Sequence, residues 1–197
     1  MRRDDRGSSA VEFAIVFMLL TVITFGIFET SLLMMQWQRA EKATQMGARY
    51  AVVSPMVAPE LATADGMDNG VEAGTPCMDA ATGATIAACA LSPNPVICQS
   101  GGCGGYGFDG VAFTAIVDEM RKILPDIDES NVVVEYRFVG LGFVGRPGGQ
   151  PLAVTVRLQN MTFDLIVLDD LVGMNGQLAM PAFATTLAGE DLSDDTI

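Results

Sequence analysis

Residues 9–53 read SAVEFAIVFMLLTVITFGIFETSLLMMQWQRAEKATQMGARYAVV, and they predict the main structural element of the chain. It contains no proline, and Ser54-Pro55 follows it directly. Proline disfavours helical backbone in the residue before it. We therefore predict one continuous helix from about Ser9 to Val53, which at 1.5 Å per residue is about 68 Å long.

The first part of this helix is apolar enough to cross a membrane. From Ala10 to Met35 the only charged residues are Glu12 and Glu29. A spanning helix needs about 20 mostly apolar residues. A charged side chain in such a helix costs about 2.5–3.5 kcal/mol at its centre, so both glutamates require a physical explanation. Trp37 follows the apolar stretch, where an indole ring suits the headgroup level.

The charges before the apolar stretch predict its orientation. Arg2, Arg3 and Arg6 precede it, together with Asp4 and Asp5. The positive-inside rule counts Lys and Arg and gives little weight to acidic residues. We therefore expect the N-terminus in the cytoplasm, the helix in the cytoplasmic (inner) membrane and the remainder of the chain outside it.

Two more general explanations fit the apolar stretch as well: a signal peptide and an uncleaved membrane anchor. A secretory signal peptide has a short apolar core and a small-residue cleavage site. The run here is longer, and no A-x-A pattern follows it. An uncleaved single-pass envelope protein, with an acidic, disulfide-bonded binding domain, fits the same hydropathy.

Three short runs carry a family resemblance. A basic leader ends in Gly7, and Glu12 is the fifth residue after it, which resembles the class III prepilin site of type IV pilins. The chain departs from many proteins of this kind at Met18, where they carry a proline. The runs that resemble the TadE/TadG-like minor pilins of tight-adherence (Tad, Flp) pili are Val11-Glu12-Phe13-Ala14, Phe25-Gly26-Ile27-Phe28-Glu29 and Gly47-Ala48-Arg49-Tyr50-Ala51.

The resemblance implies a processing and assembly route. A prepilin peptidase would remove residues 1–7 by cutting between Gly7 and Ser8, and would methylate the new N-terminus. The resemblance also implies contacts with other pilin subunits, the pilus assembly platform and the membrane, and a final place in an adhesive pilus on the cell surface. It assigns subunit assembly to Glu12, Phe13 and Glu29.

Charge pairing would explain why a carboxylate is tolerated at position 12 of the apolar helix. The ammonium that cleavage leaves on Ser8 of one subunit would meet the Glu12 carboxylate of its neighbour. Glu29 has two interpretations, which are a second inter-subunit contact and snorkelling of its carboxylate toward the outer interface.

Residues 54–108 are rich in proline and glycine and contain all four cysteines, Cys77, Cys89, Cys98 and Cys103. An even number of cysteines in an exported segment indicates two disulfides. Three pairings are possible, and the short loops favour Cys77–Cys89 with Cys98–Cys103. A zinc site is disfavoured because the chain has no histidine and no C-x-x-C.

Residues 109–197 predict a small α+β domain. Its helix should run from Asp109, as N-cap, to Leu124 before Pro125. Residues 131–139 and 152–158 predict strands, and 163–168 predicts a third strand or a short buried helix. Residues 178–187 predict an edge strand, because Pro181 confines this run to an edge or a bulge, and the acidic tail 189–197 should be frayed. The fold class is thus a long transmembrane helix followed by an extracytoplasmic domain in which one helix packs on an antiparallel sheet.

The remaining motifs point away from catalysis and cofactors. Residues 140–145 match G-x-G-x-x-G, but Arg146-Pro147 follows, so a hairpin loop is expected rather than a dinucleotide site. The carboxylates Asp126, Asp128 and Glu129 are a calcium candidate, although a solvated turn explains them better. A net charge of −13 disfavours nucleic acid. With no histidine in the chain, we expect no enzyme and no cofactor.

Overall fold

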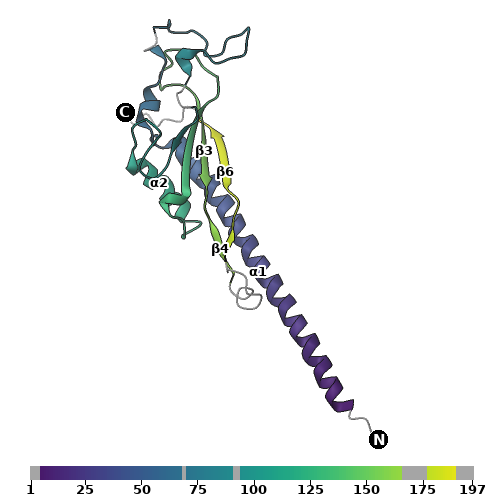
Figure 1. Ribbon diagram of the computed structural model, residues 1–197. Coiled ribbons are helices and arrows are strands. Elements are labelled where there is room, and N and C mark those ends of the chain that lie inside the picture. Colours follow the sequence, from purple (N-terminus) through teal and green to yellow (C-terminus); the bar gives the residue numbers. More distant parts are fainter. Residues whose placement is uncertain (1–4, 68–69, 91–93, 166–176, 190–197) are drawn as a thin grey trace. The chain divides into compact units, whose positions relative to one another are not determined.

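The computed structural model describes residues 5–67, 70–90, 94–165 and 177–189. The fold is α+β, as predicted (Figure 1). The helices are α1 (Asp5–Val53), α2 (Gly110–Arg121) and the short 3-10 helices η1 (Pro59–Thr63), η3 (Ala87–Cys89) and η4 (Glu129–Asn131). The strands are β1 (Val96–Cys98), β2 (Val132–Phe138), β3 (Leu152–Leu158), β4 (Thr162–Asp164), β5 (Gln177–Ala179) and β6 (Phe183–Ala188).

The chain forms two compact units. One contains Met1–Gln38 and Thr162–Met180, and the other contains Arg39–Met161 and Pro181–Ile197. The first unit holds the apolar part of α1 and the β4–β5 pair. The second holds the rest of α1, α2 and the four-stranded sheet.

The long helix ends where the sequence predicted and begins earlier. α1 reaches Val53, and Pro55 follows the residue after it. At the other end α1 starts at Asp5 rather than Ser9, so the last part of the predicted leader is helical. Gly7 does not interrupt the helix, because one glycine in a helix costs only about 1 kcal/mol relative to alanine.

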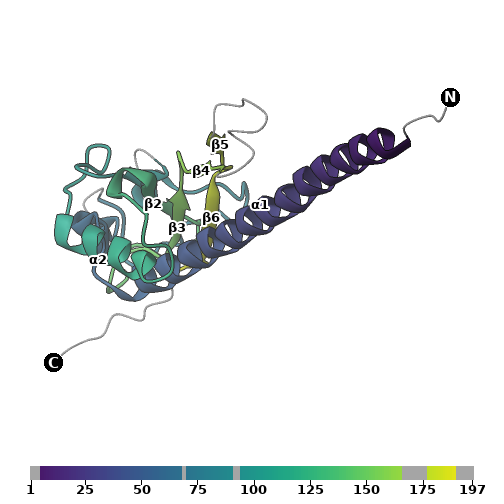
Figure 2. The same ribbon diagram turned by 90° about the horizontal axis from the view of Figure 1, so that it is seen from below.

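Small residues let the C-terminal part of α1 lie close to its neighbours in the second unit. The buried residues on this side of α1 are Ala40, Ala43, Thr44, Gly47, Ala48 and Ala51. A Cβ atom added to Gly47 would lie 2.7 Å from Sδ of Met120 in α2 and 3.2 Å from a methyl of Val156 in β3. The hydroxyl groups of Thr44 and Thr185 in β6 are hydrogen-bonded, with their Oγ1 atoms 3.0 Å apart. This blue part of α1 therefore runs beside the sheet in Figure 2.

The sheet has the strand order β1-β2-β3-β6, and every neighbouring pair in it is antiparallel. The predicted strands at 131–139 and 152–158 are confirmed as β2 and β3. Alternate residues on one face, such as Val134, Val156 and Leu158, are fully buried. On the other face Glu135 forms an ion pair with Arg157.

The predicted edge strand at 178–187 is corrected. Pro181 divides this run into β5, which pairs with β4, and β6, which lies at the edge of the sheet. Proline has no N–H group to donate to a ladder, so the pairing stops there. The β4 strand confirms the first residues of the predicted third strand, whereas 166–168 and the tail 190–197 lie outside the described residues.

Helix α2 has the predicted N-cap and buried stripe. Oδ1 of Asp109 accepts hydrogen bonds from the backbone N–H groups of Val111 (2.9 Å) and Ala112 (3.1 Å). The helix ends at Arg121, three residues before the predicted Leu124, and a tighter turn follows in which Ile123 N–H donates to the Met120 carbonyl. The buried side of α2 consists of Ala112, Phe113, Ile116, Val117 and Met120.

The loop-rich region is held by covalent and polar links. Disulfides join Cys77 to Cys89 and Cys98 to Cys103, the pairing that the short loops favoured. The buried Gln150 side chain donates from Nε2 to the carbonyls of Asp65 and Phe143. These contacts tie loops that are distant in sequence to one another.

The G-x-G-x-x-G run lies in a loop, as expected from the proline after it. Gly140, Gly142 and Gly145 have φ between 78° and 99°, a region that favours glycine. Val144 exchanges backbone hydrogen bonds with Thr75 and Gly74, so the run is part of the linked loops.

Candidate functional site: the exposed apolar part of helix α1

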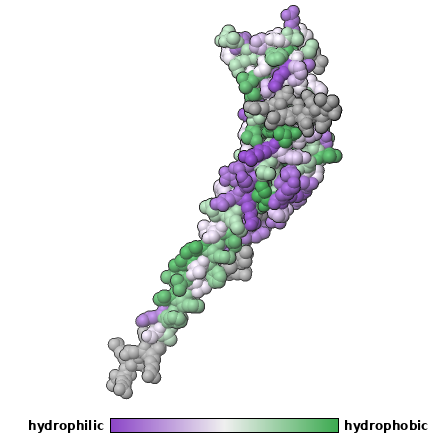
Figure 3. Space-filling view, turned by 180° about the vertical axis from the view of Figure 1, so that it is seen from behind, coloured by the Kyte–Doolittle hydropathy of each residue, from purple (hydrophilic) through white to green (hydrophobic). Residues whose placement is uncertain are grey.

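The apolar part of α1 presents large side chains to its surroundings. Phe13 is 69% exposed, Val16 62% and Leu19 63%. Figure 3 shows apolar side chains in green along this part of the helix. Among the described residues, one helix, Ser9–Val53, is long and apolar enough to cross a membrane. An apolar surface of this size in water is unfavourable, so lipid or other protein must cover it.

Hydroxyl residues in this stretch are satisfied by the helix itself. The side chains of Thr21, Thr24, Thr30 and Ser31 each donate to the carbonyl four residues earlier, at 2.7–2.8 Å. This back-bonding satisfies the hydroxyl hydrogens of these four residues within the helix. Their presence therefore does not conflict with a membrane location.

The predicted assembly residues lie at two separate heights on α1. Gly7 and Ser8 are in its first turns, and Glu12 is exposed one turn further on. Phe13 stacks on Phe17 with ring centroids 5.9 Å apart. Glu29 lies about 25 Å from Glu12 along the axis at 1.5 Å per residue, so the structure does not bring the two carboxylates together.

Glu29 occupies a different environment from Glu12. Its exposed fraction is 2%, although Ile27 and Phe28 beside it are 64% and 58% exposed. Its side chain also interacts within the chain. A carboxylate that snorkels should reach the surface, whereas Glu29 is almost fully buried.

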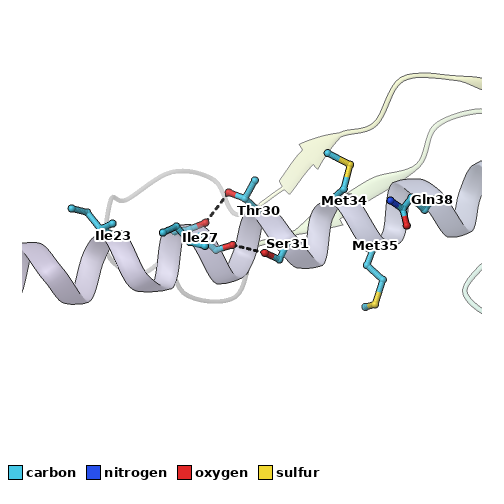
Figure 4. Close-up of a pocket in the computed structure, with 8 residues that line it drawn as sticks. Ile23, Ile27, Thr30, Ser31, Met34, Met35 and Gln38 are labelled. Atoms are coloured by element: carbon cyan, nitrogen blue, oxygen red, sulfur yellow. Dashed lines mark hydrogen bonds between the residues drawn. The ribbon is translucent and has the colours of Figure 1, made fainter.

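A groove beside α1 was missed by sequence reasoning. It has a volume of about 670 Å³ and is lined among the described residues by Ile23, Gly26, Ile27, Thr30, Ser31, Met34, Met35 and Gln38 (Figure 4). Ile27 and Met34 on its wall are 64% and 56% exposed. The available signal was Gly26, a residue without a side chain amid large apolar ones.

Two residues of the calcium candidate, Asp128 and Glu129, interact with other side chains of the domain. Asp128 and Asn131 form a reciprocal capping arrangement at η4, and Thr114 donates to Glu129 at 3.4 Å. The described residues contain no group of three or more His, Cys, Asp and Glu side chains arranged to hold a metal ion.

The geometry defines a class of protein: a single apolar helix, able to cross a membrane, that continues into an α+β domain. Residues 7–49 match the family model of TadE-like proteins. The match starts at Gly7 and ends within α1. No curated protein and no solved structure matches the chain significantly. The match over residues 7–49 and the apolar helix favour a membrane-anchored protein that resembles TadE-like proteins in this segment.

Proposed function

We propose that the protein is a minor pilin (pseudopilin) that a prepilin peptidase processes between Gly7 and Ser8 and that then joins a Tad-type adhesive pilus. The observation that carries the proposal is the TadE-like match over residues 7–49 on a helix whose apolar side chains are exposed. A structural role of this kind requires no catalysis by the chain itself.

Processing would prepare the helix electrostatically for assembly. Cleavage leaves an ammonium group on Ser8, one helical turn from Glu12. When two subunits lie side by side, Ser8 of one can stand beside the exposed Glu12 carboxylate of the other. Opposite charges attract strongly where water is scarce, so the pair lowers the cost of keeping both groups at membrane depth.

Burial of apolar surface would supply the driving force for assembly. Inside the bilayer, lipid covers the exposed side chains of α1, and after extraction into a fibre only neighbouring subunits can cover them. The helix would thus serve first as membrane anchor, with its N-terminus in the cytoplasm, and then as the packed spine of the subunit.

Processing is tested by mass. The full chain is expressed in cells with and without the cognate prepilin peptidase, beside a Gly7→Ala variant, and the membrane protein is analysed by intact mass spectrometry. We expect the parent alone to lose residues 1–7, and only with the peptidase. An unchanged parent mass with an active peptidase contradicts the proposal and favours an uncleaved envelope protein with a binding domain.

Charge pairing is tested by a second variant in the same cells. Glu12→Ala should be inserted and cleaved like the parent but should be missing from sheared pili. Incorporation at the parental level would refute the role of Glu12 while leaving the processing step intact.

A further inference from the structure

Beyond its apolar part, helix α1 carries three basic side chains on one side, and we call them the basic stripe. Arg39, Lys42 and Arg49 are exposed. Projected at about 100° per residue, they fall within a sector of about 80°. The buried positions between residues 40 and 51, which contact the sheet and α2, centre about 160° from the middle of that sector. The basic stripe therefore points away from the sheet and from α2.

The basic stripe has no counter-charge in its own domain. In the part of the chain that the structure describes, the basic partners in ion pairs are Arg121, Lys122 and Arg157, and none of them belongs to the stripe. The chain after α1 is acidic, because residues 54–161 contain twelve acidic and five basic residues. Unpaired positive charges that gather on one face favour a negatively charged partner.

The length of the basic stripe distinguishes a protein partner from lipid. Arg39 and Arg49 are ten residues apart, which is about 15 Å along the helix. The headgroup layer on each side of a bilayer is about 5–8 Å deep. On a helix that crosses the membrane, lipid phosphates can thus meet one end of the stripe. A protein that stands beside the helix can meet all of it.

The same chain offers an acidic surface that complements the stripe. Asp126, Asp128 and Glu129 form the acidic turn between α2 and β2. Asp126 and Asp128 are exposed, and Glu129 is half-buried. No ion pair within the described residues includes any of the three. The hydrogen bonds of Asp128 and Glu129 come from neutral groups, so the negative charge of the acidic turn stays uncompensated.

The acidic turn lies at the level of the basic stripe along α1. Thr185 of β6 contacts Thr44 of α1. Phe183, two residues earlier in β6, lies in the same row of the sheet as Val132, the first residue of β2. Two strand residues span about 7 Å, which equals four to five helical residues. Because β6 and α1 run in the same direction (Figure 1), β2 starts near the level of residue 40, and the acidic turn directly precedes it.

Two copies that stand side by side can therefore join these surfaces. The stripe lies on α1 and the acidic turn lies between α2 and β2, so the contact joins two different faces and can repeat from subunit to subunit. We propose that the basic stripe of one copy binds the acidic turn of a second copy of this chain. The inference rests on the proposed function, which places copies side by side, and it names the surfaces that meet.

The first test uses the scarcity of lysine, because Lys42 and Lys122 are the only lysines in the sequence. Two differently tagged copies of the full chain are expressed together with the prepilin peptidase and the assembly machinery. Membranes and sheared pili are treated with a carbodiimide, which joins amines to carboxylates. Dimers are purified through both tags in turn and digested for mass spectrometry. We expect peptides in which Lys42 is linked to Asp126 or Asp128.

Two conservative variants control this test. Lys42→Arg keeps the positive charge but has no amine to link, so incorporation into pili should be retained while the linked peptides disappear. Lys122→Arg, the same change on α2, is the matched control. Its yield of linked peptides should stay within about twofold of the parent, because Lys122 is paired with Glu119 of its own helix.

The second test reverses the charges. Lys42→Glu and Asp126→Lys should each lower incorporation into pili at least about threefold, because like charges then face each other. A chain that carries both substitutions should return to within about twofold of the parent, since the pair is restored with opposite polarity. Arg146→Glu reverses a charge outside both surfaces and is the matched control, which should assemble like the parent.

Several results would overturn the inference. Processed subunits in pili without the Lys42 peptides would exclude the contact and leave the stripe to lipid or solvent. Links from Lys42 to residues 190–197 of the chain, or to another protein, would exclude the acidic turn as the occupant. Failure of the double substitution to recover would refute direct pairing. The intact mass of the subunit reports cleavage separately, so an unprocessed chain refutes the proposed function, and linked peptides from such a chain would still support the contact between copies.

Discussion

Tyr136 in β2 holds the chain that leaves α1, and Tyr136→Phe should destabilise the protein. The phenol oxygen accepts a hydrogen bond of 3.0 Å from the backbone N–H of Val57. Both residues are fully buried. Phenylalanine fills nearly the same volume, so the principal change is a buried donor left without its acceptor. That loss costs about 1–3 kcal/mol of unfolding free energy.

The same tyrosine predicts a dependence on pH. Burial raises the pKa of Tyr136 from 10.0 to about 12, while the hydrogen bond from Val57 opposes the rise. Because the folded pKa lies above the unfolded one, the unfolded chain loses this proton first. The contribution of Tyr136 is complete below pH 10 and is lost as the pH rises toward 12. At about 1.4 kcal/mol per pKa unit, the loss reaches roughly 3 kcal/mol.

The measurement is urea unfolding of the full chain in detergent micelles with disulfides intact, followed by near-ultraviolet circular dichroism. Near neutral pH the unfolding free energy of the parent should exceed that of Tyr136→Phe by about 1–3 kcal/mol. Above pH 10 this difference should shrink, because only the parent has the buried phenol to ionise. Tyr50→Phe, at a half-buried position of α1, controls for the loss of one phenol.

Equal stability of parent and Tyr136→Phe at neutral pH would refute the hydrogen-bond argument. If the difference in unfolding free energy between the parent and Tyr136→Phe stays constant from pH 10 to 12, burial does not raise the pKa of Tyr136.

Two further substitutions test the packing of the domain. Gly47→Leu should lower the unfolding free energy by at least about 1–3 kcal/mol, because a side chain there overlaps Met120, and a thermal midpoint equal to that of the parent would contradict this close approach. Asp109→Ala should cost about 1 kcal/mol, because the first backbone N–H groups of α2 lose their acceptor. Asp126→Ala, at an exposed acidic position, is the control for Asp109→Ala and should stay within about 0.5 kcal/mol of the parent, so equal losses in both would refute the capping role.

Much of the local structure is readable from the sequence because its signals are local. Pro55 stops α1, Asp109 caps α2, and the β-branched runs form β2 and β3 as predicted. Each of these signals acts through backbone geometry or hydrogen bonds within a few residues. The TadE-like match likewise depends on a short continuous segment.

Other features depend on residues that are distant along the chain. Pro181 predicted an edge or a bulge, but the sequence did not show that the strand would divide and pair one part with β4. The need for a small residue at position 47 comes from the close approach of Met120 and Val156, which are distant in the sequence. Register and close approach are properties of pairs, and one member of a pair does not specify the other.

Hydropathy, proline and helix caps act locally, so the sequence alone predicts a long apolar helix followed by an α+β domain. The burial of single positions along that helix depends on the tertiary structure. Nearly every position from Phe13 to Phe28 is apolar, so periodicity there indicates no direction. The burial of Glu29 and the exposure of Ile27 and Met34 arise from what the rest of the chain covers.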